Sequence, residues 1–508
     1  MSPLTFWSNN LLLSELLTAH ENYSEVFQLK DKLAILGLTC DSRLVKPGFL
    51  FAAFEGTNTD GSEFIGDAIN RGAIVILSSP KLKKKFMNLD NVVWLIDINP
   101  RYCFAKLVAK FFDNQPEYVT AITGTNGKTS VACFLQQIWS SSGRNSASLG
   151  TLGIQTSIPL TRGTCTLSNN LTTPDPVNLH QNLAKLSKSG VTHIAIEASS
   201  HGLDQYRLDG LRIESAAFTN FSQDHLDFHG TESIYLASKL RLFSDLLNEG
   251  GTAVINADSH KAKTVLDTAK KRSSSIITFG KSNADICLLS EMLPSKTGQR
   301  LNLSVFGQNV ETTVPLIGAF QIFNSMCALA LAIASGVSVE NALNGIRSLK
   351  NVRGRMELVG RHPSGAPIYV DYAHTPDALK NLLLTLKPFV KNKLSIVFGC
   401  GGDRDAKKRF SMGSIAESFA DNIIVTDDNP RSEQPQLIRN AILRGCPSGK
   451  EIGNRKEAIS SAIHRLAPGD ILVVAGKGHE EGQIVHRKVL PFDDREEIKR
   501  SLEASVDE

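Results

Sequence analysis

The chain has 508 residues, 42% of them hydrophobic and 21% charged, so it is long enough for two to four globular domains with sizeable cores. Lys and Arg total 55 against 51 Asp and Glu, and this net charge of +4 excludes the overall basic field expected of a nucleic-acid-binding protein. The eight cysteines form no CxxC pair, which favours reduced thiols over disulfides or a zinc site.

The first block, residues 1–112, contains short predicted strands at Phe49 to Phe54 and Ala73 to Leu77, and its lysine run Lys81 to Lys85 predicts a solvated surface turn. No lysine or arginine precedes Lys30, so the apolar cluster near residue 11 lacks the charged start of a secretory signal. The longest apolar run, Cys327 to Ala334, is too short to span a bilayer. We therefore expect a cytoplasmic protein with no membrane partner.

The second block, residues 113–351, opens with a strand, a glycine turn and a helix. Val119 to Ile122 predicts a short buried strand, and apolar residues at helical spacing follow it: Val131, Phe134, Leu135 and Ile138. Between them lies Gly124-Thr125-Asn126-Gly127-Lys128-Thr129-Ser130, which places a lysine and hydroxyls at a helix N-terminus. This is a shortened phosphate-binding loop, because Ile122 stands where the common pattern has glycine. The alternative is a plain turn with a solvated lysine.

Three further segments of this block, "HIAIEASSHG", "AAFTNFSQDH" and "TAVINAD", each predict a strand that ends in polar residues. Strands alternating with helices predict a parallel sheet covered on both faces, with ligands at the carboxyl ends of its strands. Glu197 and His225 follow two of these strands, and with Thr129 they suggest a divalent cation beside a triphosphate. The alternative is that His201, His225 and His229 are loop histidines bonded to backbone.

Lys239 lies in a predicted helix whose expected apolar stripe is Ile234, Ala237, Leu240 and Phe243. Periodicity alone favours a lysine that extends its stem along apolar surface and keeps its amine in water.

The third block, residues 352–508, repeats the alternation in "PIYVDYAHTPDALKNLLLTL", "LSIVFGCGGDRD", "NIIVTDDNPR" and "DILVVAGKGHEE". Arg404 and Arg431 follow two of its strands, and planar guanidiniums there suit a ligand with carboxylates. The alternative is ion pairing with neighbouring carboxylates, namely Asp403, Asp405 or Asp428. Glu480, beside the glycine loop at Gly476 to Gly478, could hold a substrate ammonium group.

Taken together, "TGTNGKTS", "EASSHGL", "TNFSQDHLDFHG", "YLASK", "GAFQIFNSMCALA", "RGRME", "VDYAHTPDAL" and "GCGGDRD" resemble the Mur ligases, the ATP-dependent amide-forming enzymes of peptidoglycan precursor synthesis. The motifs occur in the family's order across most of the chain. The resemblance implies an α/β fold with three domains: 1–112 for the UDP-sugar, 113–351 as a central P-loop ATPase domain, and 352–508 as a Rossmann-like domain for the incoming amino acid.

Within the family, "LTTPDP" and "DDNPRSE" resemble the member that adds the third amino acid. The implied activity is ATP-dependent addition of meso-diaminopimelate to the D-glutamate side-chain carboxylate of UDP-N-acetylmuramoyl-L-alanyl-D-glutamate, through an acyl phosphate. It further implies a bacterial cytoplasmic monomer that uses Mg²⁺, ATP and small-molecule substrates and has no nucleic-acid partner. The alternatives are the lysine-adding sister ligase, folylpolyglutamate synthase, a P-loop switch NTPase and a non-catalytic UDP-sugar binder.

The resemblance also implies roles for individual residues. Lys128, Glu197, His225 and Lys239 would be catalytic, with Thr129, Glu197, His225 and a carbamylated Lys239 as metal ligands. ATP would be bound by Gly124 to Ser130 and by Asn324, Arg355, Asp371 and His374. The UDP-sugar dipeptide would be bound by Ser42, Thr57, Asn58, Thr59, Thr172, Thr173, Ser199, Gln205 and Arg207. Diaminopimelate would be bound by Arg404, Asp428, Asn429, Pro430, Arg431, Gly476 and Glu480, whereas the group that deprotonates its amine could be His201 or a water.

Overall fold

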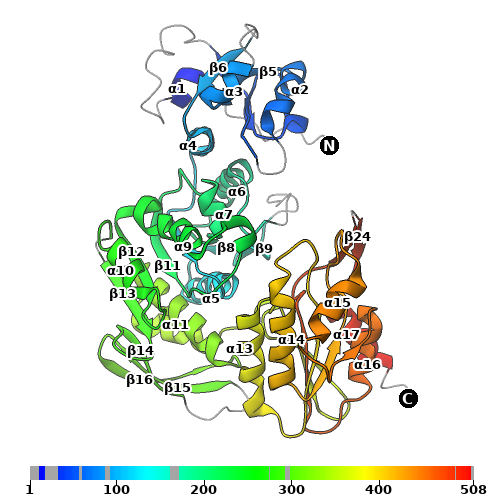
Figure 1. Cartoon of the computed structure of the whole chain (residues 1–508). Helices are drawn as coiled ribbons and strands as arrows, with labels where there is room; N and C mark the ends of the chain where they lie inside the picture. Colours follow the sequence, from blue (N-terminus) through cyan, green and yellow to red (C-terminus); the bar gives the residue numbers. More distant parts are fainter. Residues whose placement is uncertain are drawn as a thin grey trace.

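The computed structural model describes residues 11–17, 33–56, 60–85, 92–160, 171–273, 275–291, 298–486 and 488–504. These residues form three α/β domains in chain order, each built on its own main sheet (Figure 1). The predicted fold class is thereby confirmed. The exact boundaries at residues 112 and 351 stay predictions.

The N-terminal domain is built on a four-stranded parallel sheet in the order β3-β4-β5-β6, comprising β3 (Gly37–Thr39), β4 (Phe49–Ala52), β5 (Ala73–Ser78) and β6 (Val93–Ile96). A short antiparallel pair stands beside it, β1 (Leu11–Leu12) with β2 (Ala34–Ile35). The helices are α1 (Leu13–Leu17), η3 (Ser42–Leu44), η4 (Gly61–Phe64), α2 (Ile65–Asn70), α3 (Pro80–Lys85) and α4 (Pro100–Phe112). The lysine run therefore forms helix α3, where a turn was predicted.

The central domain contains a ten-stranded sheet in the order β16-β15-β14-β13-β12-β11-β7-β10-β8-β9. Its strands are β7 (Tyr118–Thr123), β8 (Ser146–Gly150), β9 (Gly153–Thr156), β10 (His193–Glu197), β11 (Ile213–Phe218), β12 (Leu247–Asn256), β13 (Ser275–Gly280), β14 (Ile286–Glu291), β15 (Gln299–Val305) and β16 (Gln308–Val314). The pairs from β8 through β14 are parallel, but β9, β15 and β16 pair antiparallel with their neighbours. The prediction of a purely parallel sheet is wrong at both edges, where hairpins extend the parallel centre.

Helices of the central domain are α5 (Lys128–Ser141), α6 (Pro176–Lys188), α7 (Ser200–Asp204), α8 (Leu226–His229), α9 (Glu232–Arg241), the π-helix η5 (Leu242–Leu246), α10 (Ala262–Ala269), α11 (Ala319–Ala334) and α12 (Val339–Arg347). Some motifs of the sequence are helix starts. In "TTPDP", for example, the Asp175 side chain caps α6 by accepting hydrogen bonds from the backbone N–H groups of Val177 and Asn178, and Pro176 occupies the first helical position.

The C-terminal domain has a six-stranded sheet in the order β17-β18-β22-β19-β20-β21, parallel except for β17. Its strands are β17 (Glu357–Arg361), β18 (Pro367–Asp371), β19 (Leu394–Phe398), β20 (Asn422–Val425), β21 (Lys450–Glu451) and β22 (Ile471–Ala475), with a separate hairpin of β23 (Gly482–Val485) and β24 (Lys488–Pro491). The helices are α13 (Pro376–Leu386), η6 (Lys387–Phe389), α14 (Lys407–Phe419), α15 (Pro435–Leu443), α16 (Arg455–Ile463) and α17 (Asp494–Ala504).

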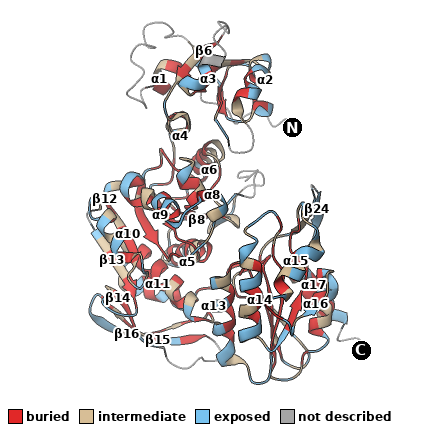
Figure 2. Ribbon diagram, in the orientation of Figure 1, coloured by how far each residue is buried: buried red, intermediate tan, exposed pale blue. Residues whose placement is uncertain are grey.

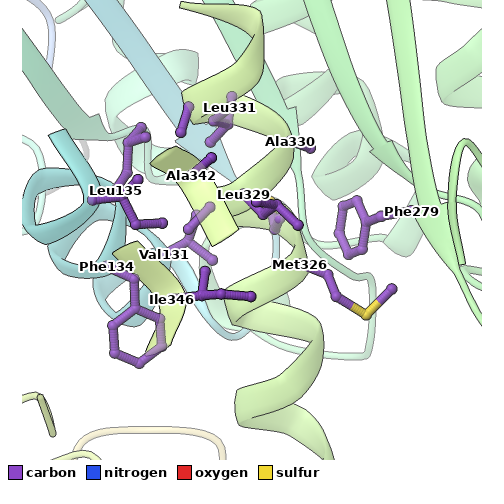
Figure 3. Packing of buried hydrophobic residues seen from close by; sticks show 14 of the residues in the cluster. Val131, Phe134, Leu135, Phe279, Met326, Leu329, Ala330, Leu331, Ala342 and Ile346 are labelled. Atoms are coloured by element: carbon purple, nitrogen blue, oxygen red, sulfur yellow. The ribbon is translucent and has the colours of Figure 1, made fainter. Parts of the chain in front are cut away.

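The helix behind the phosphate loop is held by the main core of the central domain. Val131, Phe134 and Leu135 of α5 are fully buried against α11 and α12, as Figure 3 shows. Each such side chain contributes about 1.5–3 kcal/mol of burial free energy. Elsewhere, too, the central strands of the sheets and the inward faces of the helices are buried, whereas strands at the edge such as β24 are exposed (Figure 2). The loop is thus carried by a rigid strand and a rigid helix.

Candidate active site

The phosphate loop runs from the end of β7 to the start of α5, as predicted from the sequence. Gly124 has φ 147° and Gly127 has φ 87°, conformations that residues with a side chain rarely adopt. A Cβ atom on Gly124 would overlap the Thr219 hydroxyl, and one on Gly127 would overlap the Asn324 side-chain oxygen. These two glycines are therefore required by both conformation and space.

Two lysines converge at this loop. Lys128 donates hydrogen bonds from Nζ to the carbonyl oxygens of Gly124 (2.9 Å) and Thr125 (2.8 Å), and Lys239 donates from Nζ to the same Gly124 oxygen (2.8 Å). Burial lowers the pKa of Lys128, and burial together with the neighbouring Lys128 lowers the pKa of Lys239 well below its ordinary value. The solvated-lysine alternative for Lys128 is therefore wrong.

Lys239 does not extend into water either, because it is only 1% exposed. Ile234, in the stripe that was predicted to be buried, is 52% exposed, whereas Tyr235, Ser238 and Lys239 form the buried side of α9. The predicted helix is present, but its predicted inward face is wrong. A polar face that carries a lysine is turned toward the loop.

Glu197 lies at the end of β10, where strand register pairs it with Ile122 of β7. It is 2% exposed, and its Oε2 accepts hydrogen bonds from the hydroxyls of Thr129 (2.9 Å) and Thr151 (3.2 Å). The Thr151 backbone N–H donates to its Oε1 at 2.7 Å. A carboxylate and a hydroxyl are thus held together beside the loop.

His225 lies in a left-handed backbone conformation (φ 53°) just before α8. Its Nε2 is 3.4 Å from Asp224 Oδ2, and its ring is 4.8 Å from that of His201. Burial lowers the pKa of both histidines to about 4, so both rings are neutral at pH 7. The neighbouring His229 is buried, and neither of its ring nitrogens has a hydrogen-bond partner among the described residues. The backbone-bonded alternative is therefore wrong for His229.

A first cavity of about 380 Å³ joins the central and C-terminal domains. Its walls contain the predicted nucleotide-site residues Thr125 to Ser130, Asn324, Arg355, Asp371 and His374, together with Glu197, His225 and Thr172. Arg355 crosses the domain boundary, because its Nη2 donates to the Thr129 hydroxyl at 3.2 Å while its guanidinium lies 4.2 Å from the Tyr372 ring centroid. Gly124 and Lys239 lie outside this lining.

Asp371 braces the wall of this cavity. Its Oδ2 accepts from the Met356 backbone N–H (2.7 Å) and its Oδ1 from that of Ala373 (2.8 Å). Burial raises the pKa of this carboxyl. His374, three residues further along, donates a hydrogen bond from Nδ1 to the Tyr372 carbonyl oxygen at 2.8 Å, and burial lowers its pKa.

The predicted dipeptide residues form one network beside β10. The Thr173 hydroxyl donates to the Glu197 carbonyl oxygen (2.7 Å) and lies 3.0 Å from the Ser199 hydroxyl. Arg207 donates to the Thr173 carbonyl oxygen and to Gln205 Oε1, both at 2.7 Å. Ser42 is buried in the N-terminal domain, at the start of η3. The predicted contacts at Thr57, Asn58 and Thr59 lie outside the described residues.

A second cavity of about 490 Å³ gathers the residues predicted to bind the incoming amino acid. Its lining includes Arg404, Asp428, Asn429, Arg431, Gly476 and Glu480, whereas Pro430 is buried and is not among the described lining residues. Arg431 donates through Nη1 to the Gly402 carbonyl oxygen at 2.8 Å. Hydrogen bonds from Ser432 and, to a smaller extent, the nearby Arg431 and Arg404 guanidiniums lower the pKa of Asp403, so the ion-pair alternative stays open for Asp403.

The two cavities share a wall made of Asp224, His225, Tyr372, His374 and Asp377. The first two residues come from the central domain and the other three from the C-terminal domain. A group bound at the phosphate loop and a group bound near the two arginines would therefore lie next to each other. This geometry is suited to a reaction between two molecules bound in the adjacent cavities.

The sequence analysis missed several residues of the site. Asp224 was passed over in favour of the adjacent His225, and Thr151 follows a strand whose end carries no charged residue to mark it. Asn220 accepts from the Asn126 backbone N–H at 2.8 Å and so fixes the phosphate loop from another strand end. The motif "TNFSQDH" contained both Asn220 and Asp224 and could have identified them.

Among the described residues, no helix has the length and apolarity needed to cross a membrane.

Comparison with known proteins gives three family matches along the chain. Residues 34–112 match the Mur ligase family catalytic domain, residues 122–332 the Mur ligase middle domain, and residues 354–478 the Mur ligase glutamate ligase domain. The chain is 45% identical to a UDP-N-acetylmuramoyl-L-alanyl-D-glutamate--2,6-diaminopimelate ligase of Bradyrhizobium diazoefficiens, over 93% of this chain and 96% of the relative. A ligase of the same description from Rhizobium meliloti is 45% identical, over 95% of this chain and 98% of the relative.

Comparison with solved structures also finds Mur ligases. A structure of a UDP-N-acetylmuramoyl-L-alanyl-D-glutamate--2,6-diaminopimelate ligase is similar with a TM-score of 0.69 and 32% identity, covering 98% of this chain and 99% of that one. The MurF ligase of Thermotoga maritima in complex with ADP shares the fold, with a TM-score of 0.61, 18% identity, and coverage of 92% and 97%. The chain belongs to the Mur ligase family.

Proposed function

We propose that the protein is an ATP-dependent ligase that joins meso-diaminopimelate to the D-glutamate side-chain carboxylate of UDP-N-acetylmuramoyl-L-alanyl-D-glutamate. The observation that carries this proposal is the wall shared by the cavity that holds the phosphate loop and the cavity lined by the Arg404 and Arg431 side chains. The named relatives in Bradyrhizobium and Rhizobium support the substrate assignment. We further propose that it acts as a monomer in the bacterial cytoplasm.

The reaction needs ATP because a carboxylate is a poor electrophile. In the proposed first step, an oxygen of the glutamate carboxylate attacks the γ-phosphorus of ATP, and ADP leaves. The substrate amine then attacks the acyl phosphate carbon, a tetrahedral intermediate forms, and phosphate leaves as the amide forms. Lys128 and the N-terminus of α5 would stabilise the charge on the phosphates.

The donor set beside the loop fits a magnesium ion. Magnesium prefers oxygen ligands, and it usually takes one or two carboxylates plus phosphate oxygens and water. Thr129 and Glu197 offer a hydroxyl and a carboxylate 2.9 Å apart, although the described residues contain no cluster of three or more His, Cys, Asp or Glu side chains. We propose that Thr129 and Glu197 hold the ion, with His225 and a carbamylated Lys239 as further ligands. When bound, it would supply positive charge that offsets the phosphate charge.

The amine must lose a proton before or during its attack. His201 lines the second cavity, and burial lowers its pKa to about 4, so its ring is neutral at pH 7 but a weak base. His201 and a water stay the two candidates for this step. The dipeptide carboxylate would be oriented by Arg207 and Gln205, which already form one network with Thr173.

A direct assay tests the proposal. Purified protein is given ATP, Mg²⁺ and UDP-N-acetylmuramoyl-L-alanyl-D-glutamate with meso-diaminopimelate, L-lysine or L-glutamate, and phosphate release and product mass are measured. We expect a new tripeptide product with diaminopimelate alone. A lysine product would identify the sister ligase, and glutamate addition in a parallel mixture that holds a folate in place of the UDP-dipeptide would identify folylpolyglutamate synthase. Full ATP turnover without any amino acid would support a switch NTPase, and no turnover at all would support a simple binder.

A further inference from the structure

A buried lysine that has no role in the reaction described above lies against the amino-acid cavity. Lys477 follows β22 and its side chain is 0% exposed. Its Nζ donates to Asn429 Oδ1 (3.1 Å), Glu480 Oε2 (3.1 Å) and the Gly482 carbonyl oxygen (2.6 Å). An ammonium group has three N–H donors, and all three are used here. A buried charge held this completely is fixed in one position.

The chain turns Lys477 inward through the glycines on either side of it. Gly476 has φ 112° and Gly478 has φ 57°. A Cβ on Gly476 would lie 2.7 Å from Asp428 Oδ2, and one on Gly478 would lie 2.8 Å from the Tyr372 Cβ atom. The sequence "AGKG" therefore allows a close approach to both neighbours that residues with side chains would prevent.

Lys477 and the Ile484 backbone N–H together determine which way the Asn429 amide points. Asn429 Oδ1 accepts from Lys477 and also from the Ile484 backbone N–H at 2.8 Å. With its oxygen occupied by two donors, the amide must present Nδ2 to the other side, and Nδ2 donates to Glu480 Oε2 at 2.8 Å. Reversing the amide would place its NH₂ group against two donors.

Glu480 is thereby fixed from two directions at one oxygen. Oε2 accepts from both Asn429 and Lys477, whereas Oε1 has no hydrogen-bond partner among the described residues. Glu480 lines the second cavity and is 32% exposed at its side chain. The protein therefore hydrogen-bonds to one oxygen of the Glu480 carboxylate, and the other oxygen is available to a ligand.

We propose that Lys477 is a positioning residue for amino-acid selection, which orients Glu480 and Asn429 so that one Glu480 oxygen accepts a hydrogen bond from the substrate ammonium. This inference rests on the proposed function, because it takes an amino acid as the ligand of the second cavity. Lys477 itself does not touch the substrate.

Replacing the lysine separates this role from a purely structural one. Lys477→Met keeps the length and removes the charge, so Glu480 loses a charged donor and Asn429 loses one of the two donors to its oxygen. We expect KM for diaminopimelate to rise about 10- to 100-fold. KM for ATP and for the UDP-dipeptide should stay within about twofold, because the other substrates do not depend on this oxygen. Lys488→Met, an exposed lysine on β24, is the matched control and should change none of the three constants.

A double-mutant cycle tests whether Lys477 acts through Glu480. In a Glu480→Gln background, Lys477→Met should add less than about threefold to KM for diaminopimelate, because the target of its action is gone. If the two effects multiply in full, or if all three KM values rise together, the proposal is overturned. Should Lys477→Met be recovered unfolded, Lys477→Gln, which keeps two N–H donors without the charge, is measured against the same three constants.

The unmodified protein is assayed first, so the two proposals can fail separately. If it accepts lysine in place of diaminopimelate, the proposed function is wrong, and the Lys477 constants are measured with lysine. A selective rise of KM for that amino acid would still support the positioning role. An unchanged KM for the accepted amino acid in Lys477→Met would overturn it.

Discussion

Lys128 of α5 and Lys239 of α9 donate hydrogen bonds to one oxygen, the carbonyl of Gly124, at 2.9 and 2.8 Å. Two ammonium groups on one acceptor repel each other, which is one reason that the pKa of Lys239 lies well below its ordinary value, after burial itself. A neutral amine is the form that reacts with carbon dioxide. Carbamylation of Lys239 would replace this repulsion with attraction.

Lys239→Met should therefore lower kcat about 10- to 100-fold, since it removes the group that the carbamate would be built on. The rate of ADP release at saturating substrates measures this. Native mass spectrometry of the unmodified protein in bicarbonate should show a mass increase of one carbon dioxide that Lys239→Met lacks. Lys270→Met, an exposed lysine at the end of α10, is the control and should behave as the unmodified protein. A normal kcat in Lys239→Met would contradict the carbamate role.

Arg431 should discriminate diaminopimelate from lysine. A guanidinium built to pair the second carboxylate is left unmatched when lysine binds, and such sites reject the deficient analogue by on the order of ten thousand-fold. Arg431→Ala should raise KM for diaminopimelate sharply while leaving KM for ATP near normal. Arg431 has φ 51°, so Arg431→Lys, with the same backbone requirement, controls for strain. Equal use of both amino acids by the unmodified enzyme would refute this assignment.

Gly354 should be irreplaceable where the chain enters the C-terminal domain. It has φ 64°, and an added Cβ would overlap the His479 backbone nitrogen. Gly354→Ala should lower the free energy of unfolding by at least about 2 kcal/mol, from the left-handed backbone and the overlap combined. Gly365→Ala is a matched control, with φ 86° but nothing within 4 Å of the added atom, and should cost only about 1 kcal/mol. Urea unfolding midpoints of the two variants measure these costs. An equal loss of stability in Gly354→Ala and Gly365→Ala would contradict the steric overlap at Gly354.

His180 should make stability depend on pH. This histidine of α6 is 3% exposed, and burial lowers its pKa from 6.5 to about 4. Between these two pH values the unfolded chain binds a proton that the folded chain excludes. Stability therefore falls as pH is lowered from 6.5 toward 4, by about 3 kcal/mol in total, and His180 has no such effect above 6.5.

His180→Leu should remove this part of the acid sensitivity. Urea midpoints at pH 7 and pH 4.5 measure it, and the difference between the two should shrink in the variant. His464→Gln changes an exposed histidine of the C-terminal domain and should leave the difference unaltered. If the urea midpoint falls between pH 7 and pH 4.5 by the same amount in His180→Leu and in the unmodified protein, His180 is not the source of the acid sensitivity.

Features encoded locally were predictable from the sequence. The phosphate loop, with β7 before it and α5 after it, follows from glycines, a lysine and apolar spacing within some twenty residues. The strand ends that carry Glu197, Arg404 and Asn429 were also predicted, because parallel sheets gather polar residues at one edge. The local sequence pattern was sufficient to predict a feature wherever a single helix or strand and the residues at its end determine the geometry.

Features that depend on distant contacts were not predictable. Helical periodicity alone placed Lys239 in water, and only the family resemblance gave it a role at the site. The carbonyl of Gly124, in a distant loop, supplies the acceptor that holds it inside. Asp371 lines the first cavity, as expected, but that its carboxylate accepts hydrogen bonds from two backbone N–H groups depends on Met356 and Ala373 and could not be predicted. The antiparallel edges of the central sheet arise from hairpins whose pairing no single strand reveals.

The wall between the cavities has a practical consequence for inhibition. Because Tyr372 and His374 face both spaces, a single compound that carries a phosphate mimic at one end and a diamino diacid at the other could cross this wall with a short linker. Such a compound would hold the central and C-terminal domains together, since each contributes half of the partition. Its affinity would come from tethering two weak fragments.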